Sequence, residues 1–79
     1  MAYQVALPRP VKRQLDDLPV TWRNRILETL RDLGDDPRPH GCRKLTNSES
    51  WLVRVGDYRV IYKVDDRTKV IIIGWIRLR

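Results

Sequence analysis

The chain contains little of what disulfide frameworks and cofactor sites are built from. Its 79 residues include one cysteine, Cys42, and one histidine, His40. A single cysteine cannot form an internal disulfide, and neither residue belongs to a cluster with the ligand spacing of a metal site. Of the four glycines, Gly56 and Gly74 are isolated and match no phosphate-binding loop. We therefore expect no metal and no other cofactor.

A long apolar run is also missing. No segment approaches the roughly 18 apolar residues that span a bilayer, and the first residues lack the charged head and apolar stretch of a signal peptide. Together with the unpaired cysteine, these absences favour a cytoplasmic protein that does not engage a membrane. At this length, residues 1–79 are expected to form one domain with a thin margin of stability.

Positive charge, in contrast, is abundant. Sixteen lysines and arginines oppose ten aspartates and glutamates, which gives a formal net charge of +6. Most of the excess is arginine, whose planar guanidinium group suits phosphate. Such a balance favours a polyanion or an acidic protein as partner, through long-range attraction and counterion release. Ordinary solubilising charge is the alternative that the positions of the arginines must decide.

The N-terminal half of the sequence predicts one strand and two helices. Alternating apolar residues over 3–7 indicate a strand, and apolar residues at helical spacing over 10–18 indicate a short helix that Pro19 ends. A longer helix is expected to begin at Thr21 as its N-cap and to stop at Gly34. The apolar stripe of this helix consists of Trp22, Ile26, Leu27, Leu30 and Leu33.

The C-terminal half predicts a sheet. Residues 35–42 hold two prolines and a glycine and are expected to form a surface loop. β-branched and aromatic residues dominate three segments, 51–55, 58–64 and 69–76, which are the expected strands. The last is apolar at nearly every position, which predicts a strand covered on both faces. The fold class is therefore α+β, in the order β-α-α-β-β-β, with a two-helix hairpin packed on one face of an antiparallel sheet.

Two arginines are expected to face each other across the first hairpin. Gly56 and Asp57 fit a two-residue type II′ turn, which places Arg54 directly opposite Arg59 on one face of the sheet. Opposed like charges destabilise a sheet by a few tenths of a kcal/mol or more, so an anion is expected to compensate. The alternative is that both side chains extend into water or pair with nearby carboxylates.

Further basic residues are expected near this pair: Lys63, Arg77, Arg79, Arg43 and Lys44. Lys63 shares the face of Arg59, and Arg43 and Lys44 enter from the loop that precedes the sheet. The face of Arg77 depends on the turn after the second strand of the hairpin. A loop with an odd number of residues places Arg77 beside Arg59, whereas an even one places it under the helices. We expect the odd loop, and hence a basic patch on the face opposite the helices.

The remaining residues do not indicate a catalytic or ligand-binding site. No nucleophile-base pair stands out, and His40 and Cys42 are expected to have incidental or structural roles. Trp22, Trp51 and Tyr62 fit core positions. Trp75 and Tyr58 also fit the core, with stacking on a nucleobase as the alternative.

The segment Trp51–Tyr62 resembles the central signature of the RelE/ParE toxin superfamily. Residues 15–19 and 37–45 also resemble the end of a helix and the pre-sheet loop of that family, and the similarity covers essentially the whole chain. The resemblance implies the toxin of a type II toxin-antitoxin system, which is neutralised by a cognate acidic antitoxin. The toxin would be a monomer alone or part of a hetero-oligomer with its antitoxin.

In the RelE branch, the resemblance implies a ribosome-dependent endoribonuclease that cleaves mRNA and inhibits translation. The ribose 2′-hydroxyl attacks the adjacent phosphate without a metal, and basic side chains move protons and stabilise the charge on phosphorus. The catalytic positions implied by the resemblance are Arg59, Arg54, Arg77 and Lys44. The residues expected to contact RNA are Lys63, Arg43 and Arg79.

The sequence departs from the family after Gly74. Residues 75–79 contain neither the frequent histidine-arginine pair nor the tyrosine that stacks on the substrate base. Because arginine hardly gives up its proton, Arg54 leaves the general base unassigned, and Lys44 could serve only with a lowered pKa. Two alternatives therefore stay open: a ParE-like toxin that inhibits DNA gyrase by binding, and a catalytically weak homologue that retains antitoxin binding.

Overall fold

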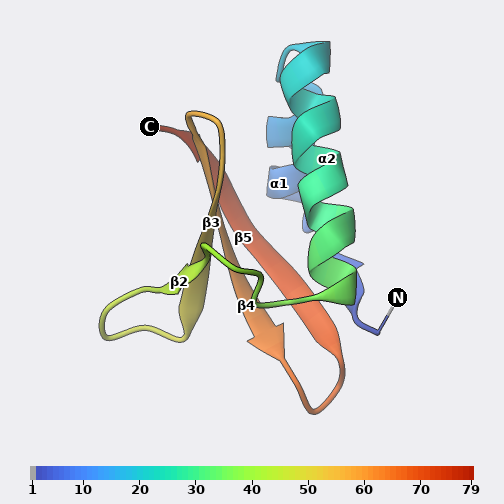
Figure 1. The fold of residues 1–79 in the computed structure, drawn as a ribbon. Coiled ribbons are helices and arrows are strands. Elements are labelled where there is room, and N and C mark those ends of the chain that lie inside the picture. Colours follow the sequence, from blue (N-terminus) through green and yellow to red (C-terminus); the bar gives the residue numbers. More distant parts are fainter. Residues whose placement is uncertain (1) are drawn as a thin grey trace.

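Two helices and a five-stranded sheet make up the computed structural model, which describes residues 2–79 (Figure 1). The elements are β1 (Gln4–Ala6), α1 (Arg9–Asp16), α2 (Val20–Asp35), β2 (Arg43–Lys44), β3 (Ser50–Val55), β4 (Tyr58–Asp65) and β5 (Val70–Leu78). Across the sheet the strands lie in the order β1-β5-β4-β3-β2. The α+β class and the helical hairpin on one face are confirmed.

Two features of the sheet differ from the expectation. β1 pairs with β5 in parallel, so the sheet is mixed rather than antiparallel throughout. The pairing direction of a strand so distant in sequence cannot be inferred from its own residues. The second difference is β2, a two-residue edge strand that pairs with β3 just after the predicted loop. Two residues are too few to show the alternation by which a strand is predicted.

Prolines rather than a capping side chain set the start of each helix. α1 follows Pro8 and α2 follows Pro19, and no side-chain hydrogen bond caps either helix. Thr21 therefore lies inside the first turn of α2, and its predicted role as N-cap is wrong. Gly34 does not end α2 either, because the helix continues to Asp35. Its buried carbonyl instead accepts a 2.9 Å hydrogen bond from the Tyr3 backbone N–H.

The core lies between the helices and one face of the sheet. Its members come from α1, α2, β3, β4 and β5, and they are Val11, Leu15, Ile26, Leu30, Leu33, Val53, Val55, Val60, Tyr62, Ile71, Ile73 and Ile76. Trp51 and Tyr58 pack against this cluster from its edge. Leu27, predicted in the apolar stripe of α2, is 38% exposed because it points away from the sheet.

The turn between β3 and β4 is the predicted one. Gly56 has φ +61° and Asp57 does not have a positive φ, as a type II′ turn requires. The Trp22 ring covers this turn so closely that a Cβ on Gly56 would lie 2.4 Å from two of its atoms. Trp22 also contacts Tyr58, with ring centroids 5.2 Å apart. α2 is thereby attached to the end of the sheet where Arg54 and Arg59 meet.

β5 is an interior strand, but it is not covered on both faces. β1 and β4 flank it, while the helices cover one side only, so Ile72 is 45% exposed on the other. Beyond the end of β1, the free edge of β5 is paired by a side chain. The Gln14 amide accepts from the Ile76 N–H at 3.0 Å and donates to the Ile76 carbonyl at 3.1 Å. A side chain of α1 thus pairs the backbone N–H and carbonyl of Ile76, which have no neighbouring strand on this edge.

A β-bulge decides which face Arg77 occupies. The loop after β4 is even, because Asp65 pairs with Val70 and four residues, 66–69, lie between them. The expected odd loop is therefore wrong. The register nevertheless shifts along the strand, since Tyr62 pairs with Ile73 and Ile61 with Trp75, which leaves Gly74 as an extra residue. This one-residue shift returns Arg77 to a position opposite Arg59.

Candidate functional site

Three arginines form one cross-strand row on the sheet face opposite the helices. Arg54 of β3 pairs with Arg59 of β4, and Arg59 pairs with Arg77 of β5. Directly opposed Cβ atoms in such a ladder are about 5 Å apart, so the three positive charges repel one another. Within residues 2–79, no carboxylate forms an ion pair with any of them. We call Arg54, Arg59 and Arg77 the arginine row.

Arg59, in the middle of the row, carries an unsatisfied donor. Its side chain is half-buried, and its Nε is shielded from solvent without a hydrogen-bond partner in the structure. A buried donor left unpaired costs about 1–3 kcal/mol, and more when the group is charged. The alternative, in which nearby carboxylates of this chain pair with the arginines, is therefore not found within residues 2–79, and the row suits an external anion whose oxygens accept from guanidinium groups.

An apolar row lies directly beside the arginines on the same face. It consists of Leu52, Ile61 and Trp75, again one residue from each strand. Leu52 and Ile61 are buried, whereas Trp75 is half-buried and lies outside the core cluster under the helices. The guanidinium carbon of Arg77 lies 4.6 Å from the centroid of the Trp75 ring. The expected core role of Trp75 is therefore wrong, because the bulge places it on the open face.

The remaining predicted basic residues divide between two faces. Lys63 and Arg43 share the face of the arginine row, since Lys63 has the parity of Arg59 and Arg43 pairs with Leu52. Lys44 pairs with Trp51, which lies on the helix-side face, so the structure does not bring Lys44 to the row. Arg79 follows the end of β5, with its N–H 2.8 Å from the Asp57 carbonyl oxygen.

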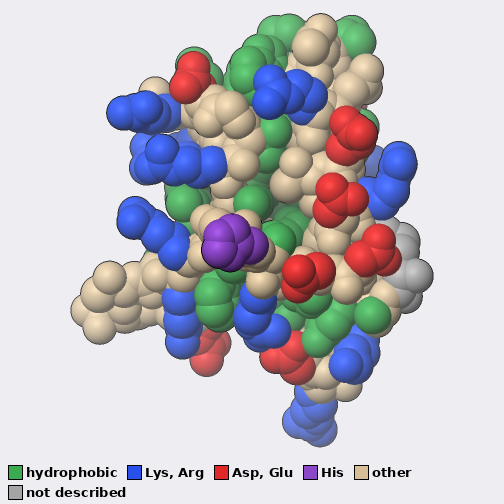
Figure 2. All heavy atoms as spheres, in the orientation of Figure 1, with side chains coloured by type: hydrophobic (Ala, Val, Ile, Leu, Met, Phe, Trp, Pro, Cys, Tyr) green, Lys and Arg blue, Asp and Glu red, His purple; other side chains and the backbone are tan. Residues whose placement is uncertain are grey.

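Charge is unevenly distributed over the surface as well. Figure 2 shows lysine and arginine side chains gathered on the side of β2, β3 and the C-terminus, and acidic side chains along the C-terminal half of α2. His40 lies exposed between these two regions. In the part of the chain that the structure describes, no group of three or more His, Cys, Asp or Glu residues could hold a metal ion. Nor is any described helix long and apolar enough to cross a membrane.

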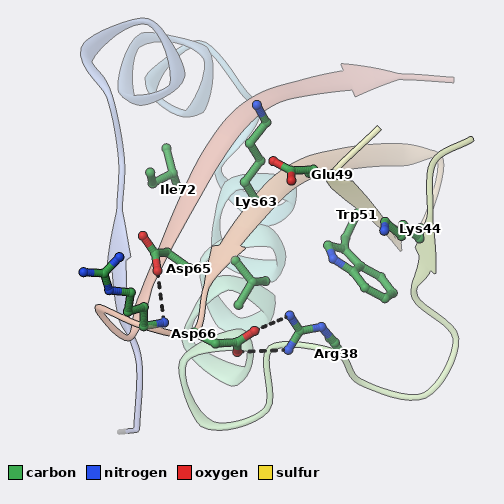
Figure 3. Close-up of a pocket in the computed structure, with 10 residues that line it drawn as sticks. Arg38, Lys44, Glu49, Trp51, Lys63, Asp65, Asp66 and Ile72 are labelled. Atoms are coloured by element: carbon green, nitrogen blue, oxygen red, sulfur yellow. Dashed lines mark hydrogen bonds and ion pairs between the residues drawn. The ribbon is translucent and has the colours of Figure 1, made fainter. Parts of the chain in front are cut away.

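A cavity of about 530 Å³ lies where the loop that follows α2 meets the β4–β5 turn (Figure 3). Its lining mixes both signs of charge, from Arg38, Lys44, Glu49, Lys63, Asp65, Asp66 and Arg67. At its base Arg38 donates to both carboxylate oxygens of Asp66, at 2.8 and 3.2 Å, and the Tyr3 hydroxyl donates to Asp66 at 2.5 Å. Arg38 and Asp66 neutralise each other, and Glu49 and Asp65 lie among the remaining basic side chains, so the cavity is a weaker candidate for anion binding than the arginine row.

The same region contains a buried tyrosine whose role is structural. The Tyr62 hydroxyl donates to the Pro37 carbonyl at 2.7 Å, and burial is the main cause that raises the pKa of this phenol. Tyr62 therefore stays neutral and holds the loop that follows α2 against the sheet, as its predicted core position implies.

Asp66→Asn should change how stability depends on acid. Hydrogen bonds from Arg38, and then from Tyr3, lower the pKa of Asp66 from 3.8 to about 2. A carboxylate with a depressed folded-state pKa stabilises the fold above its unfolded pKa and loses that contribution as pH falls through the folded value. Urea unfolding midpoints should therefore fall more steeply in the wild type than in Asp66→Asn between pH 4 and pH 2. Glu28→Gln, on the exposed side of α2, is the control, and equal slopes in wild type and Asp66→Asn would contradict the assignment.

Comparison with known proteins places this site in a family. The family model described as the ParE toxin of the type II toxin-antitoxin system parDE matches residues 5–77. The chain belongs to the ParE toxin family. The resemblance to the RelE/ParE toxin superfamily is thereby confirmed. Among curated protein sequences, none matches this ParE-family chain at a significant level.

Solved structures of toxin-antitoxin complexes share the fold of this ParE-family chain. A chain of the archaeal RelE-RelB complex from Pyrococcus horikoshii is 34% identical, with a TM-score of 0.90 over 100% of this chain and 97% of that one. The complex RelBE2 from Mycobacterium tuberculosis matches at 24% identity and a TM-score of 0.88, with both chains fully covered. The Escherichia coli RelBE complex matches at 20% identity and a TM-score of 0.85, over 99% and 98% of the two chains.

Sequence reasoning missed Trp75 as part of the site, although a signal was present. Trp75 and Arg77 are two residues apart on one strand, so their side chains lie on the same face. Once Arg77 was expected on the open face, Trp75 belonged there too. The unpaired Nε of Arg59 could not be predicted from the sequence, because its burial depends on how neighbouring side chains pack around that one atom.

Proposed function

We propose that this toxin is a RelE-like endoribonuclease that binds mRNA in the ribosome and inhibits translation by cleaving it. The observation that carries the proposal is the arginine row, in which three guanidinium groups lack a carboxylate partner and one buried Nε lacks any partner. RNA phosphate supplies the missing acceptors. The likeness to RelE chains, one of them 34% identical, supports the same reading.

In this proposal the arginine row stabilises charge rather than transferring protons. The ribose 2′-hydroxyl gives its proton to water and its oxygen attacks the adjacent phosphorus, so that the phosphate passes through a more negative five-coordinate state. The bond to the 5′-oxygen then breaks, the 5′-oxygen takes a proton from water, and a 2′,3′-cyclic phosphate remains. Three fixed guanidinium groups on one side of that phosphate stabilise the added charge. They stay protonated throughout, because arginine does not titrate in the accessible pH range. Lys63 and Arg43, on the same face, extend the contact along the RNA, and Arg79 contributes from beyond β5.

Lys44 has a different place in the proposal. It lines the mixed-charge cavity together with Glu49 and Lys63 (Figure 3). Its strand position lies on the helix-side face with Trp51, and not on the face of the arginine row. We therefore assign the chemistry to the arginine row and give Lys44 a supporting contact.

The proposed partner is a cognate antitoxin of acidic character. The structural relatives are toxin-antitoxin complexes by their descriptions, and the excess positive charge of this chain would attract an acidic segment. The free toxin would be a monomer, and the neutralised form a hetero-oligomer.

Arg59→Ala tests the function. In a translation extract with a defined mRNA, the wild-type protein should generate new 5′ ends, and Arg59→Ala should slow their appearance roughly 100- to 1,000-fold, as loss of one fixed donor does at other sites. Arg31→Ala, an exposed arginine on α2, is the control of equal charge and should retain activity. Retained circular dichroism and antitoxin binding would show that Arg59→Ala folds.

Inhibition of DNA gyrase without cleavage is the second candidate function. It is favoured by the family model, which is that of ParE, and by the position of Lys44, which pairs with Trp51 on the helix-side face and not with the arginines. An intact message in the extract, together with loss of supercoiling by purified gyrase, would replace the ribonuclease by this function. An intact message and unaffected gyrase would leave only antitoxin binding.

A further inference from the structure

We propose that Trp75 and the groove beside it bind a nucleobase of single-stranded RNA, next to the phosphate held by the arginine row. This inference rests on the proposed function, because it takes the row as a phosphate site. It adds a second kind of contact to that site, in which an aromatic ring and an apolar groove recognise a base while the arginines recognise the backbone.

The position of Trp75 is set by the bulge. Gly74 is the extra residue of β5, and the shift after it puts Trp75 opposite Ile61 on the open face. The ring is half-buried, with the Arg77 guanidinium carbon 4.6 Å from its centroid. A stacked guanidinium holds the ring in place and makes it part of a cationic surface. Trp75 therefore presents an aromatic ring on the open face, directly beside a guanidinium group.

A groove of about 350 Å³ begins on the other side of Trp75. Its lining includes Ile61, Lys63, Ile72, Gly74 and Trp75, but not Arg77. The lining residues of β5 other than Trp75 precede it along the strand, whereas Arg77 follows it. Trp75 thus stands between the groove and the arginine row. Because Gly74 has no side chain, the floor beside the ring stays open, and the exposed Ile72 forms an apolar wall beyond it.

The charges around the groove favour a nucleotide as its occupant. The arginine row lies at one end, Lys63 lies at the other, and the groove lining within residues 2–79 contains no carboxylate. A nucleoside in a single strand has the same pattern, with a flat base between two phosphates. Single-stranded nucleic acids are bound in this way elsewhere, by aromatic platforms within a basic groove. An acidic peptide would match the charges but would not need a flat aromatic platform.

A pair of RNA probes separates the base contact from the phosphate contacts. One probe is a short fluorescein-labelled 2′-O-methyl RNA, which cannot be cleaved by attack of a 2′-hydroxyl, and the other is the same oligonucleotide with abasic sites. Affinities of the full-length wild type, Trp75→Ala, Trp75→Phe and Arg59→Ala for both probes are measured by anisotropy at several salt concentrations. Circular dichroism and thermal unfolding confirm that each variant is folded.

Trp75→Ala should weaken binding of the intact probe roughly 5- to 100-fold, as loss of one stacking contact does. It should leave binding of the abasic probe unchanged, and Trp75→Phe should stay close to wild type. The salt dependence should be the same in Trp75→Ala as in wild type, whereas Arg59→Ala should reduce its slope by about 0.7 for one lost phosphate contact on a single strand.

Other outcomes would overturn the inference, and they differ from failure of the proposed function. If Arg59→Ala weakens binding with a reduced salt slope but Trp75→Ala affects both probes equally or neither, the row binds phosphate and the base site is wrong. If Trp75→Ala weakens only an antitoxin complex, the groove belongs to a protein partner. If the wild type binds no probe and cleaves no message in the extract, the proposed function itself fails.

Discussion

Insertion of one alanine between Gly74 and Trp75 should destabilise the protein by several kcal/mol, although it removes no side chain. With Gly74 as the extra residue of the bulge, Trp75 lies opposite Ile61. The inserted residue would take that position and shift every later residue by one, so that each exchanges faces, because side chains alternate along a strand. Ile76, now buried in the core, would turn outward, and Trp75 and Arg77 would turn toward the helices. An unpaired arginine in that core would cost several kcal/mol by itself.

Gly74→Ala is the matched control for this insertion. A Cβ at position 74 would lie 3.3 Å from the Ile61 carbonyl oxygen, a close contact that a small local shift relieves. The bulge and the faces of Trp75 and Arg77 are kept. Urea unfolding of the two variants should therefore show a small loss for Gly74→Ala and a loss comparable with the whole stability of the domain for the insertion. An insertion variant as stable as Gly74→Ala would mean that the register after Gly74 does not determine the face of Arg77.

The pairing of Arg54 with Arg59 could be predicted because a two-residue turn fixes the register of a hairpin. The place of Arg77 could not be derived in the same way. The loop after β4 has four residues rather than an odd number, and only the bulge at Gly74 restores the predicted neighbour of Arg59. The location was thus right and its reason wrong. Bulges depend on how two strands fit together in the sheet, and a single glycine in an apolar run does not identify one.

Lys44 and Thr21 are two further positions at which prediction from the sequence was wrong. Lys44 was expected beside the arginines from its place in the sequence, but pairing of β2 with β3 sets its face, and a two-residue strand gives no pattern from which to predict that pairing. Thr21 has the chemistry of an N-cap, yet Pro19 starts the helix two residues earlier. Local preference was overridden in one case by a tertiary contact and in the other by a stronger neighbouring residue.

Arg59→Met should make the free protein more stable while it removes the activity. In the absence of a ligand, Arg59 places a charge between Arg54 and Arg77 and leaves its buried Nε unpaired. Both effects destabilise the folded state, and methionine retains most of the side-chain volume without them. The free energy of unfolding should rise by about 1–2 kcal/mol in urea denaturation, and mRNA cleavage should be lost.

Arg54→Met separates the two causes of this gain. Arg54 is exposed, so its replacement relieves repulsion without removing a buried unpaired donor, and we expect a gain of only a few tenths of a kcal/mol. Added sulfate should stabilise the wild type more than Arg59→Met, because an anion on the arginine row supplies the missing acceptors and is lost with the guanidinium. An Arg59→Met protein less stable than wild type, with the same response to sulfate, would show that Arg59 supports the fold and that the row holds no anion. If Arg59→Met is instead more stable than wild type and responds less to sulfate, the unpaired arginines destabilise the free protein and favour anion binding. The free energy that they cost in the free protein is recovered when phosphate binds to them.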